Sequence, residues 1–105
     1  VSEPEMEVAK FVENLKYIIE TSNRTILNSY ELDIYIPELN KAIEFNGEWW
    51  HYNYNNPLCK PRGYHGLKSN RCREKGIKLL HIREDLWLKN KNKMKQVITQ
   101  FLKIK

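Results

Sequence analysis

Two acidic residues, Asp33 and Glu44, have the spacing of a metal-binding pair. Each lies in a segment that alternates polar and apolar residues, 31–36 and 41–46, and this alternation predicts two β-strands. Residues 37–40 between them predict a tight turn, so a symmetric antiparallel hairpin places Asp33 opposite Glu44. Because facing carboxylates repel, we expect a proton or a cation between them, and Mg²⁺ is a hard ion that prefers oxygen ligands. The alternative is a solvated outer face on which both side chains meet water.

Histidines and basic side chains beyond the hairpin could serve phosphate chemistry. His51 can act as a general base, because an imidazole with an ordinary pKa of about 6.5 accepts a proton near neutral pH; an exposed loop histidine is the alternative. A basic helix is predicted over residues 63–75, and one of its faces would offer donors to a phosphate, unless it is only a solvated basic face. The residues concerned are His65, Lys68, Ser69 and Cys72, with Arg71, Arg73 and Lys75 close by. A zinc site of His51, Cys59, His65 and Cys72 would be a further alternative, but the spacing matches no structural zinc pattern.

An aromatic and polar segment follows the second strand. Trp49 and Trp50 could stack on nucleic-acid bases or wedge between base steps, unless part of this segment is core. The predicted DNA contacts are Trp49, Trp50, Arg62, Lys68 and Arg71.

The remaining elements are predicted from hydrophobic periodicity. Residues 3–20 show the spacing of an amphipathic helix, which the polar residues 21–24 end. Residues 77–83 form a short apolar run that predicts a strand in the middle of the sheet, and an apolar stripe from Met94 to Leu102 predicts a last helix. The predicted order is therefore α-β-β-α-β-α, an α/β (α+β) fold with helices packed on a mixed sheet.

Composition narrows the class of protein. The chain has 105 residues, 18 Lys+Arg against 13 Asp+Glu, and a net charge of +5. This size predicts one domain, residues 1–105, with its own hydrophobic core, and the charge favours a polyanionic partner such as nucleic acid. No apolar run approaches the roughly 20 residues of a membrane span and none resembles a signal peptide, so we expect a cytoplasmic protein. Because the first residue is Val, we also expect a fragment of a longer chain.

Four segments together carry a resemblance to a known family. They are ELDIYIP at 31–37, AIEFNGEWWH at 42–51, YHGLK at 64–68 and KGIKLLHI at 75–82. They resemble the PD-(D/E)XK nucleases, and more narrowly the branch related to very short patch repair endonucleases, which includes phage and mobile-intron homing endonucleases with an EDxHD-type active site. The resemblance covers about residues 2 to 87 and implies a restriction-endonuclease-like three-layer core.

The resemblance also implies roles for residues of the hairpin and the segment after it. Asp33 would bind the catalytic metal, and His51 would be the base or proton shuttle. Glu44 would be the acidic residue of the E-x-K pattern, in which Asn46 stands here in place of the lysine. The missing positive charge must then come from elsewhere, and Lys68 and His51 are the candidates.

Further roles are implied for residues of the two helices. Glu5 would support the site from the first helix, with Glu7 as its rival. His65 would match a further acidic or histidine position, and Lys68 would lie near the scissile phosphate.

These observations predict the catalytic domain of a sequence-specific DNA endonuclease, a homing endonuclease of a phage or mobile intron, which hydrolyses double-stranded DNA with Mg²⁺ or Mn²⁺. Because so small a domain has little surface for a long target, we expect a DNA-binding region outside these residues; a dimer formed through such regions is left open. A mismatch-specific repair nickase would use the same site. A non-catalytic nucleic-acid-binding module would explain the charge and the aromatic residues, but not Asp33 opposite Glu44.

Overall fold

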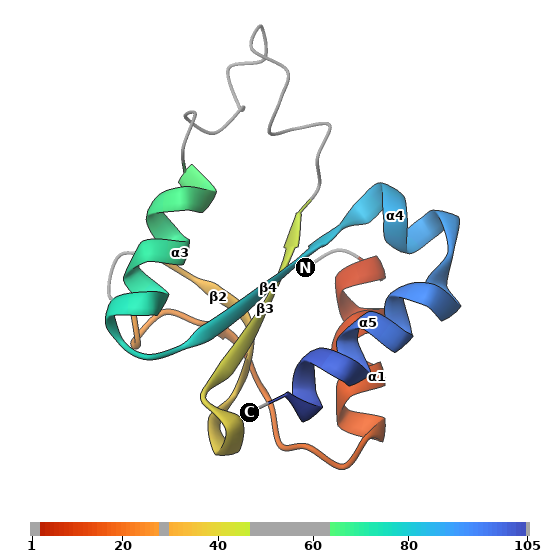
Figure 1. Cartoon of the computed structure of the whole chain (residues 1–105), viewed down its shortest axis with the longest axis horizontal. Coiled ribbons are helices and arrows are strands. Elements are labelled where there is room, and N and C mark those ends of the chain that lie inside the picture. Colours follow the sequence, from red (N-terminus) through yellow and green to blue (C-terminus); the bar gives the residue numbers. More distant parts are fainter. Residues whose placement is uncertain (1–2, 28–29, 47–63, 105) are drawn as a thin grey trace, which may run out of the picture.

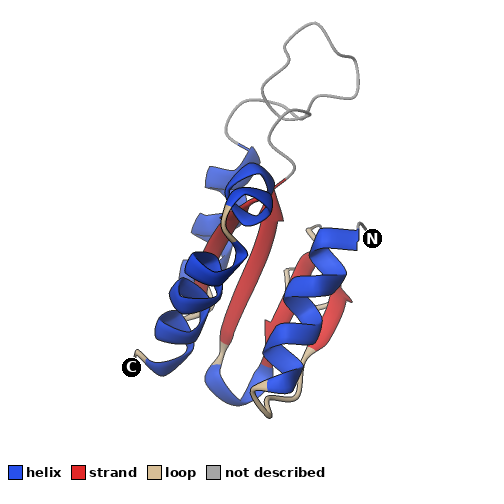
Figure 2. Cartoon of the chain, turned by 90° about the vertical axis from the view of Figure 1, so that its right-hand side faces the viewer, coloured by secondary structure: helices blue, strands red, loops and turns tan. Residues whose placement is uncertain are grey.

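The computed structural model describes residues 3–27, 30–46 and 64–104, with the backbone alone for 64–66. Its helices and strands are α1 (Glu3–Asn14), β1 (Glu20–Asn23), β2 (Leu32–Ile36), the 3₁₀ turn η1 (Pro37–Leu39), β3 (Lys41–Asn46), α3 (Tyr64–Glu74), β4 (Lys78–Arg83), α4 (Glu84–Lys89) and α5 (Lys91–Lys103). The strands form one sheet in the order β1-β2-β3-β4. Helix α3 packs on one face, and α1, α4 and α5 pack on the other (Figures 1 and 2). The predicted mixed sheet flanked by helices is confirmed.

Helix α1 is shorter than its hydrophobic spacing predicts. It ends at Asn14, because Lys16 adopts a left-handed backbone conformation with φ of 75°. Ile18, part of the predicted stripe, is 78% exposed. The predicted helix over residues 3–20 is therefore wrong beyond Asn14.

The polar residues that follow α1 contain a strand that the sequence did not predict. Strand β1 pairs antiparallel with β2, with Glu20 opposite Tyr35 and Asn23 opposite Leu32. Its side chains are mostly exposed, so backbone pairing with β2 forms this strand rather than any apolar pattern of its own.

The central hairpin has the predicted strands and register. Strands β2 and β3 are antiparallel, and Ile34 lies opposite Ile43 while Ile36 lies opposite Lys41. The turn is η1 followed by Asn40, whose φ of 52° reverses the chain. The alternation of the sequence therefore identified this part of the sheet correctly.

Strand β4 lies at the edge of the sheet, so the prediction of a central strand at 77–83 is wrong. It pairs in parallel with β3 along its whole length, from Lys41–Lys78 to Asn46–Arg83, and no other described strand pairs with it. Helices cover both faces of β4, and a parallel strand covered on both faces is largely apolar whatever its place in the sheet.

The predicted last helix is confirmed as α5, and a short helix that the sequence did not predict, α4, precedes it. They meet at Asn90, whose side chain accepts a hydrogen bond from the backbone N–H of Lys93 at 3.1 Å and caps α5. Together with β1, this changes the predicted order α-β-β-α-β-α to α-β-β-β-α-β-α-α in the described residues.

Two hydrophobic clusters hold the helices on the sheet. The buried residues of the larger cluster are Val8, Ala9, Val12, Ile34, Ile36, Ile43, Ile82, Trp87, Ile98 and Leu102. Those of the smaller one, under α3, are Leu27, Leu32, Ala42, Cys72 and Ile77. Within the three described ranges, no helix has the length and apolar character needed to cross a membrane.

Candidate active site

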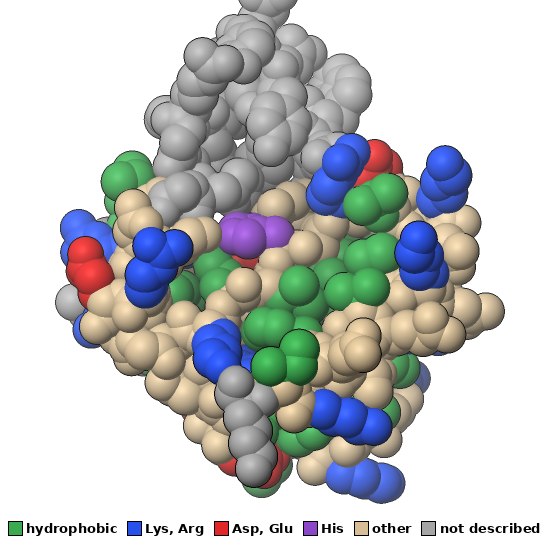
Figure 3. Space-filling view, in the orientation of Figure 1, with side chains coloured by type: hydrophobic (Ala, Val, Ile, Leu, Met, Phe, Trp, Pro, Cys, Tyr) green, Lys and Arg blue, Asp and Glu red, His purple; other side chains and the backbone are tan. Residues whose placement is uncertain are grey.

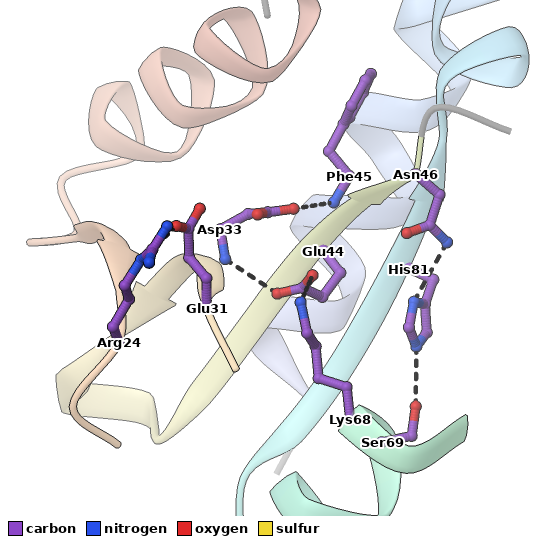
Figure 4. Close-up of polar contacts among 9 residues, drawn as sticks. All are labelled: Arg24, Glu31, Asp33, Glu44, Phe45, Asn46, Lys68, Ser69 and His81. Carbon is purple, nitrogen blue, oxygen red and sulfur yellow. Dashed lines mark hydrogen bonds and ion pairs between the residues drawn. The ribbon is translucent and has the colours of Figure 1, made fainter. Parts of the chain in front are cut away.

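The carboxylates of Asp33 and Glu44 bridge β2 and β3 just beyond the last backbone pair of the hairpin, Ile34–Ile43. The backbone N–H of Asp33 donates to Glu44 Oε1 at 3.0 Å, and the backbone N–H of Phe45 donates to Asp33 Oδ2 at 2.9 Å (Figure 4). Each side chain thus satisfies a donor of the opposite strand, and this fixes the two carboxylates side by side. The predicted pairing is confirmed, and the alternative of a solvated outer face is wrong for Glu44, which is 2% exposed.

Lys68 reaches this pair from helix α3. Its Nζ lies 2.7 Å from Glu44 Oε2, and the side chains of Lys68 and Glu44 are 4% and 3% exposed. Cys72, one turn further along α3, is also buried, so this face of the helix is turned towards the sheet. The ammonium of Lys68, a predicted catalytic residue and DNA contact, is therefore buried against a carboxylate.

Helix α1 brings Glu5, and not its rival Glu7, to the carboxylate pair. Glu5 hydrogen bonds with Asp33, and burial together with the charge of Asp33 raises the pKa of Glu5 to about 7. Glu7 lies elsewhere: its carboxylate is 2.9 Å from Lys91 Nζ and 3.2 Å from Trp87 Nε1, and these hydrogen bonds lower its pKa. Of the two glutamates that the sequence left open, Glu5 is the one that lies beside Asp33, and its supporting role stays a prediction.

Asp33 and Lys68 have opposite effects on the pKa of Glu44. Burial, and then the charge of Asp33, raise the pKa of Glu44 to about 7, while Lys68 acts in the opposite direction. Glu5 and Glu44 therefore hold protons more tightly than isolated carboxylates would. A cation beside them would lower this repulsion, so the charge pattern favours a positively charged ligand.

His81 completes the site, and the sequence analysis did not select it. It lies on β4 directly beside Glu44 on β3, its Nε2 is 3.0 Å from Ser69 Oγ, and its Nδ1 is 3.4 Å from Asn46 Nδ2 (Figure 4). Burial and the nearby Lys68 lower its pKa. The available signal was weak, because His81 stands inside an otherwise apolar strand and only the parallel register with β3 reveals its neighbours.

The oxygen donors suit a hard divalent cation. Carboxylates and amides are the ligands that Mg²⁺ and Mn²⁺ take, and Asp33, Glu44 and Asn46 provide them. The described parts of the chain contain no group of three or more His, Cys, Asp or Glu that could hold a metal ion together. Two carboxylates are nevertheless enough for Mg²⁺, which keeps several water ligands and binds substrate phosphates. The residues therefore fit the predicted Mg²⁺ or Mn²⁺.

Several predicted site residues lie outside the described residues. These are His51, Trp49, Trp50, Arg62 and the side chain of His65. The alternative zinc site also depends on this part of the chain, because it needs His51 and Cys59. Arg71, a predicted DNA contact, lies exposed on the last turn of α3, away from Glu44 and Lys68 on the buried face.

Comparison with known proteins finds a similarity of structure. Neither the protein-family models nor the curated protein sequences match this chain. Among solved structures, the catalytic domain of the homing endonuclease I-Bth0305I superposes with a TM-score of 0.73 over 96% of this chain and 94% of that domain. The two chains share this fold. At 24% sequence identity the comparison establishes the architecture, and the chemistry has to be argued from the residues.

Proposed function

We propose that this chain is the catalytic domain of a DNA endonuclease that depends on a divalent metal ion. The observation that carries the proposal is the pair Asp33 and Glu44, held side by side between two strands with Lys68 against Glu44. A buried carboxylate with a strongly raised pKa, as Glu44 has, is typical of sites that do chemistry. The fold shared with a homing endonuclease catalytic domain supports the same proposal.

Asp33 and Glu44 would hold Mg²⁺ or Mn²⁺. When bound there, the ion would supply Lewis-acid chemistry, polarising a phosphoryl oxygen and lowering the pKa of water. The contribution of the chain is to preorganise the ligands. The backbone N–H groups of Asp33 and Phe45 fix one oxygen of each carboxylate, which limits the freedom of both side chains before any ligand arrives.

Lys68 would supply the positive charge that an E-x-K pattern places two residues after the glutamate. Asn46 stands at that position here, but the ammonium of Lys68 reaches Glu44 from α3 instead. A fixed cation in a site with little water stabilises the negative charge that develops on a phosphate during hydrolysis. Lys68 would therefore act on the scissile phosphate of the DNA from within the site.

Proton transfer would involve Glu5 and the histidines implied by the resemblance. With a pKa of about 7, Glu5 can hold a proton near neutral pH and donate it in a hydrogen bond to Asp33. We propose His51 as the base that activates water, with His65 as a further contributor.

The proposed substrate is double-stranded DNA, with Trp49, Trp50, Arg62, Lys68 and Arg71 as contacts. Lys and Arg side chains are spread over the visible face rather than gathered in one patch (Figure 3). Because a domain of 105 residues has little surface for a long target, we propose that target recognition depends on a DNA-binding region beyond this domain. The whole protein would be a cytoplasmic homing endonuclease of a phage or mobile intron, related to very short patch repair enzymes. A dimer would form through such additional regions.

Cleavage of a supercoiled plasmid tests this function. The protein is incubated with plasmid in Mg²⁺ or in EDTA, and the wild type is compared with Asp33→Ala and His51→Ala. We expect nicking or linearisation in Mg²⁺ only, and its loss in both variants.

Two results would favour one of the alternative functions instead. Binding to DNA that is equal in Mg²⁺ and EDTA, without any cleavage, would identify a non-catalytic binding module. Nicking confined to substrates with a mispair would identify a repair nickase with the same site.

A further inference from the structure

Asn46 carries an unusual polar atom beside the carboxylates. Its Oδ1 is buried and has no hydrogen-bond partner in the part of the chain that the structure describes. A buried acceptor without a partner costs about 1–3 kcal/mol, so such atoms call for an explanation. Asn46 lies two residues after Glu44 on β3, and alternation along a strand puts both side chains on the same face of the sheet.

His81 fixes the orientation of this carboxamide. The amide nitrogen of Asn46 only donates, so His81 Nδ1 accepts from it at 3.4 Å, and His81 Nε2–H donates to Ser69 Oγ at 3.0 Å. This arrangement requires a neutral imidazole, which agrees with the lowered pKa of His81. In Figure 4, Nδ2 of Asn46 is the atom joined to His81, and Oδ1 lies on the side of the amide nearer to Glu44 and Asp33. The chain Ser69, His81 and Asn46 therefore leaves the amide oxygen available inside the site.

We propose that Asn46 Oδ1 is an oxygen acceptor for the hydrated divalent cation bound at Asp33 and Glu44, and that His81 is the positioning residue that holds the amide in this orientation. The inference rests on the proposed function, because it presupposes that cation. An amide oxygen cannot pair with a phosphate oxygen, since both are acceptors, so a cation or its bound water is the partner of matching chemistry. A neutral donor also adds no further negative charge to Glu5, Asp33 and Glu44.

Binding of Mn²⁺ in the absence of DNA, measured by isothermal titration calorimetry, tests the inference without relying on activity. We expect Asn46→Leu, which keeps the size but removes the oxygen, to weaken Mn²⁺ binding about tenfold. The matched control is Asn92→Leu on the exposed surface of α5, which should bind as the wild type does.

A comparison of His81→Ala in the wild type and in an Asn46→Asp variant shows whether His81 orients the amide of Asn46 or only supports the fold. His81→Ala should weaken Mn²⁺ binding about tenfold in the wild type, because the amide can then turn. In an Asn46→Asp background the same change should have little effect, because the two oxygens of a carboxylate are equivalent and need no orientation.

Two results would overturn the inference. Wild-type affinity in Asn46→Leu would show that Oδ1 does not face the cation, and an equal loss from His81→Ala in both backgrounds would show that His81 only supports the fold. Asp33→Asn separates this inference from the proposed function. If Asp33→Asn abolishes binding while Asn46→Leu does not, only this inference fails; if the wild type does not bind Mn²⁺, both fail.

Discussion

The carboxylate of Glu44 is buried, and the ammonium group of Lys68 lies against it at 2.7 Å. Removing one member of a buried ion pair leaves the other charge without compensation, and this typically costs more than the intact pair contributes. The pair therefore constrains the site more than it stabilises the fold.

The effect of the buried ion pair on the stability of the fold can be tested by substituting Lys68. We expect Lys68→Met to lower the free energy of unfolding by about 3 kcal/mol, and the double variant Lys68→Met/Glu44→Gln to recover most of that loss. Urea denaturation measures the free energy of unfolding of both variants. The control is Lys75→Met, because Lys75 is exposed and directly follows α3. Equal stability of Lys68→Met and Lys75→Met would contradict the buried pair.

The raised pKa of Glu5 should make the stability of the fold depend on pH. Its pKa rises from 4.5 to about 7 on folding, so its contribution to stability is fully present below about pH 4.5 and is lost as the pH rises to about 7. Glu5→Gln cannot ionise, and its melting temperature should therefore gain on that of the wild type between about pH 5 and about pH 8.

The control for this experiment is Glu7→Gln on the same helix. The pKa of Glu7 is lowered, so its titration falls below this pH range and its difference from the wild type should stay constant. A constant difference for Glu5→Gln as well would refute the raised pKa of Glu5.

Individual residues were predictable from the sequence where a local pattern places them. Alternation and a symmetric turn are enough to put Asp33 opposite Glu44. The choice between Glu5 and Glu7 depends on how α1 lies on the sheet, and the selection of His81 depends on the register between two strands distant in sequence. Neither piece of information is local, so the sequence could not provide it.

At the scale of elements, Asn40 joins the two turns that hold β2, β3 and β4 together. Its backbone is left-handed with φ of 52°, its Oδ1 accepts from the hydroxyl of Tyr35 at 2.7 Å, and its Nδ2 donates to the carbonyl of Gly76 at 2.9 Å. The turn after β2 is thereby tied to the turn before β4, and the parallel register that places His81 beside Glu44 begins there.

Substitutions of Asn40 should separate the contribution of its left-handed backbone from that of its side-chain hydrogen bonds. Asn40→Ala loses the hydrogen bonds and strains the backbone, so we expect a loss of about 2 kcal/mol in the free energy of unfolding. Asn40→Gly keeps the backbone geometry and should lose about 1 kcal/mol. Urea denaturation gives both values, and an Asn40→Ala variant as stable as the wild type would contradict the role of this residue.

Elements with a strong pattern of their own were predictable, and those formed by pairing were not. The hairpin has alternation and turn residues, so its strands and register were found. Strand β1 is polar and exists because β2 offers a free edge, and α1 stops early because Lys16 leaves the helical conformation. The edge position of β4 was missed because cover by helices gives an edge strand the composition of a central one.

At the scale of the whole molecule, the net charge of +5 should make DNA binding sensitive to salt. Each phosphate contact contributes about 0.9 to the slope of log affinity against log salt concentration, so Arg71→Ala should weaken binding at low salt and reduce this slope by about 1. Fluorescence anisotropy in EDTA measures this without cleavage.

The matched control is Lys93→Ala. Lys93 is also exposed but lies on α5, on the opposite face of the sheet from α3 (Figure 1), and the slope should be unchanged. Equal slopes for Arg71→Ala and the wild type would remove Arg71 from the proposed DNA contacts.

We propose above all that Asp33 belongs to a metal-dependent site that cleaves DNA. The most direct test is the single-turnover rate of plasmid cleavage in Mg²⁺ for Asp33→Asn and for Glu7→Gln, which alters a carboxylate outside the site. We predict that Asp33→Asn lowers the rate at least about 100-fold and that Glu7→Gln stays within about threefold of the wild type. A rate for Asp33→Asn as high as that of Glu7→Gln would contradict the account.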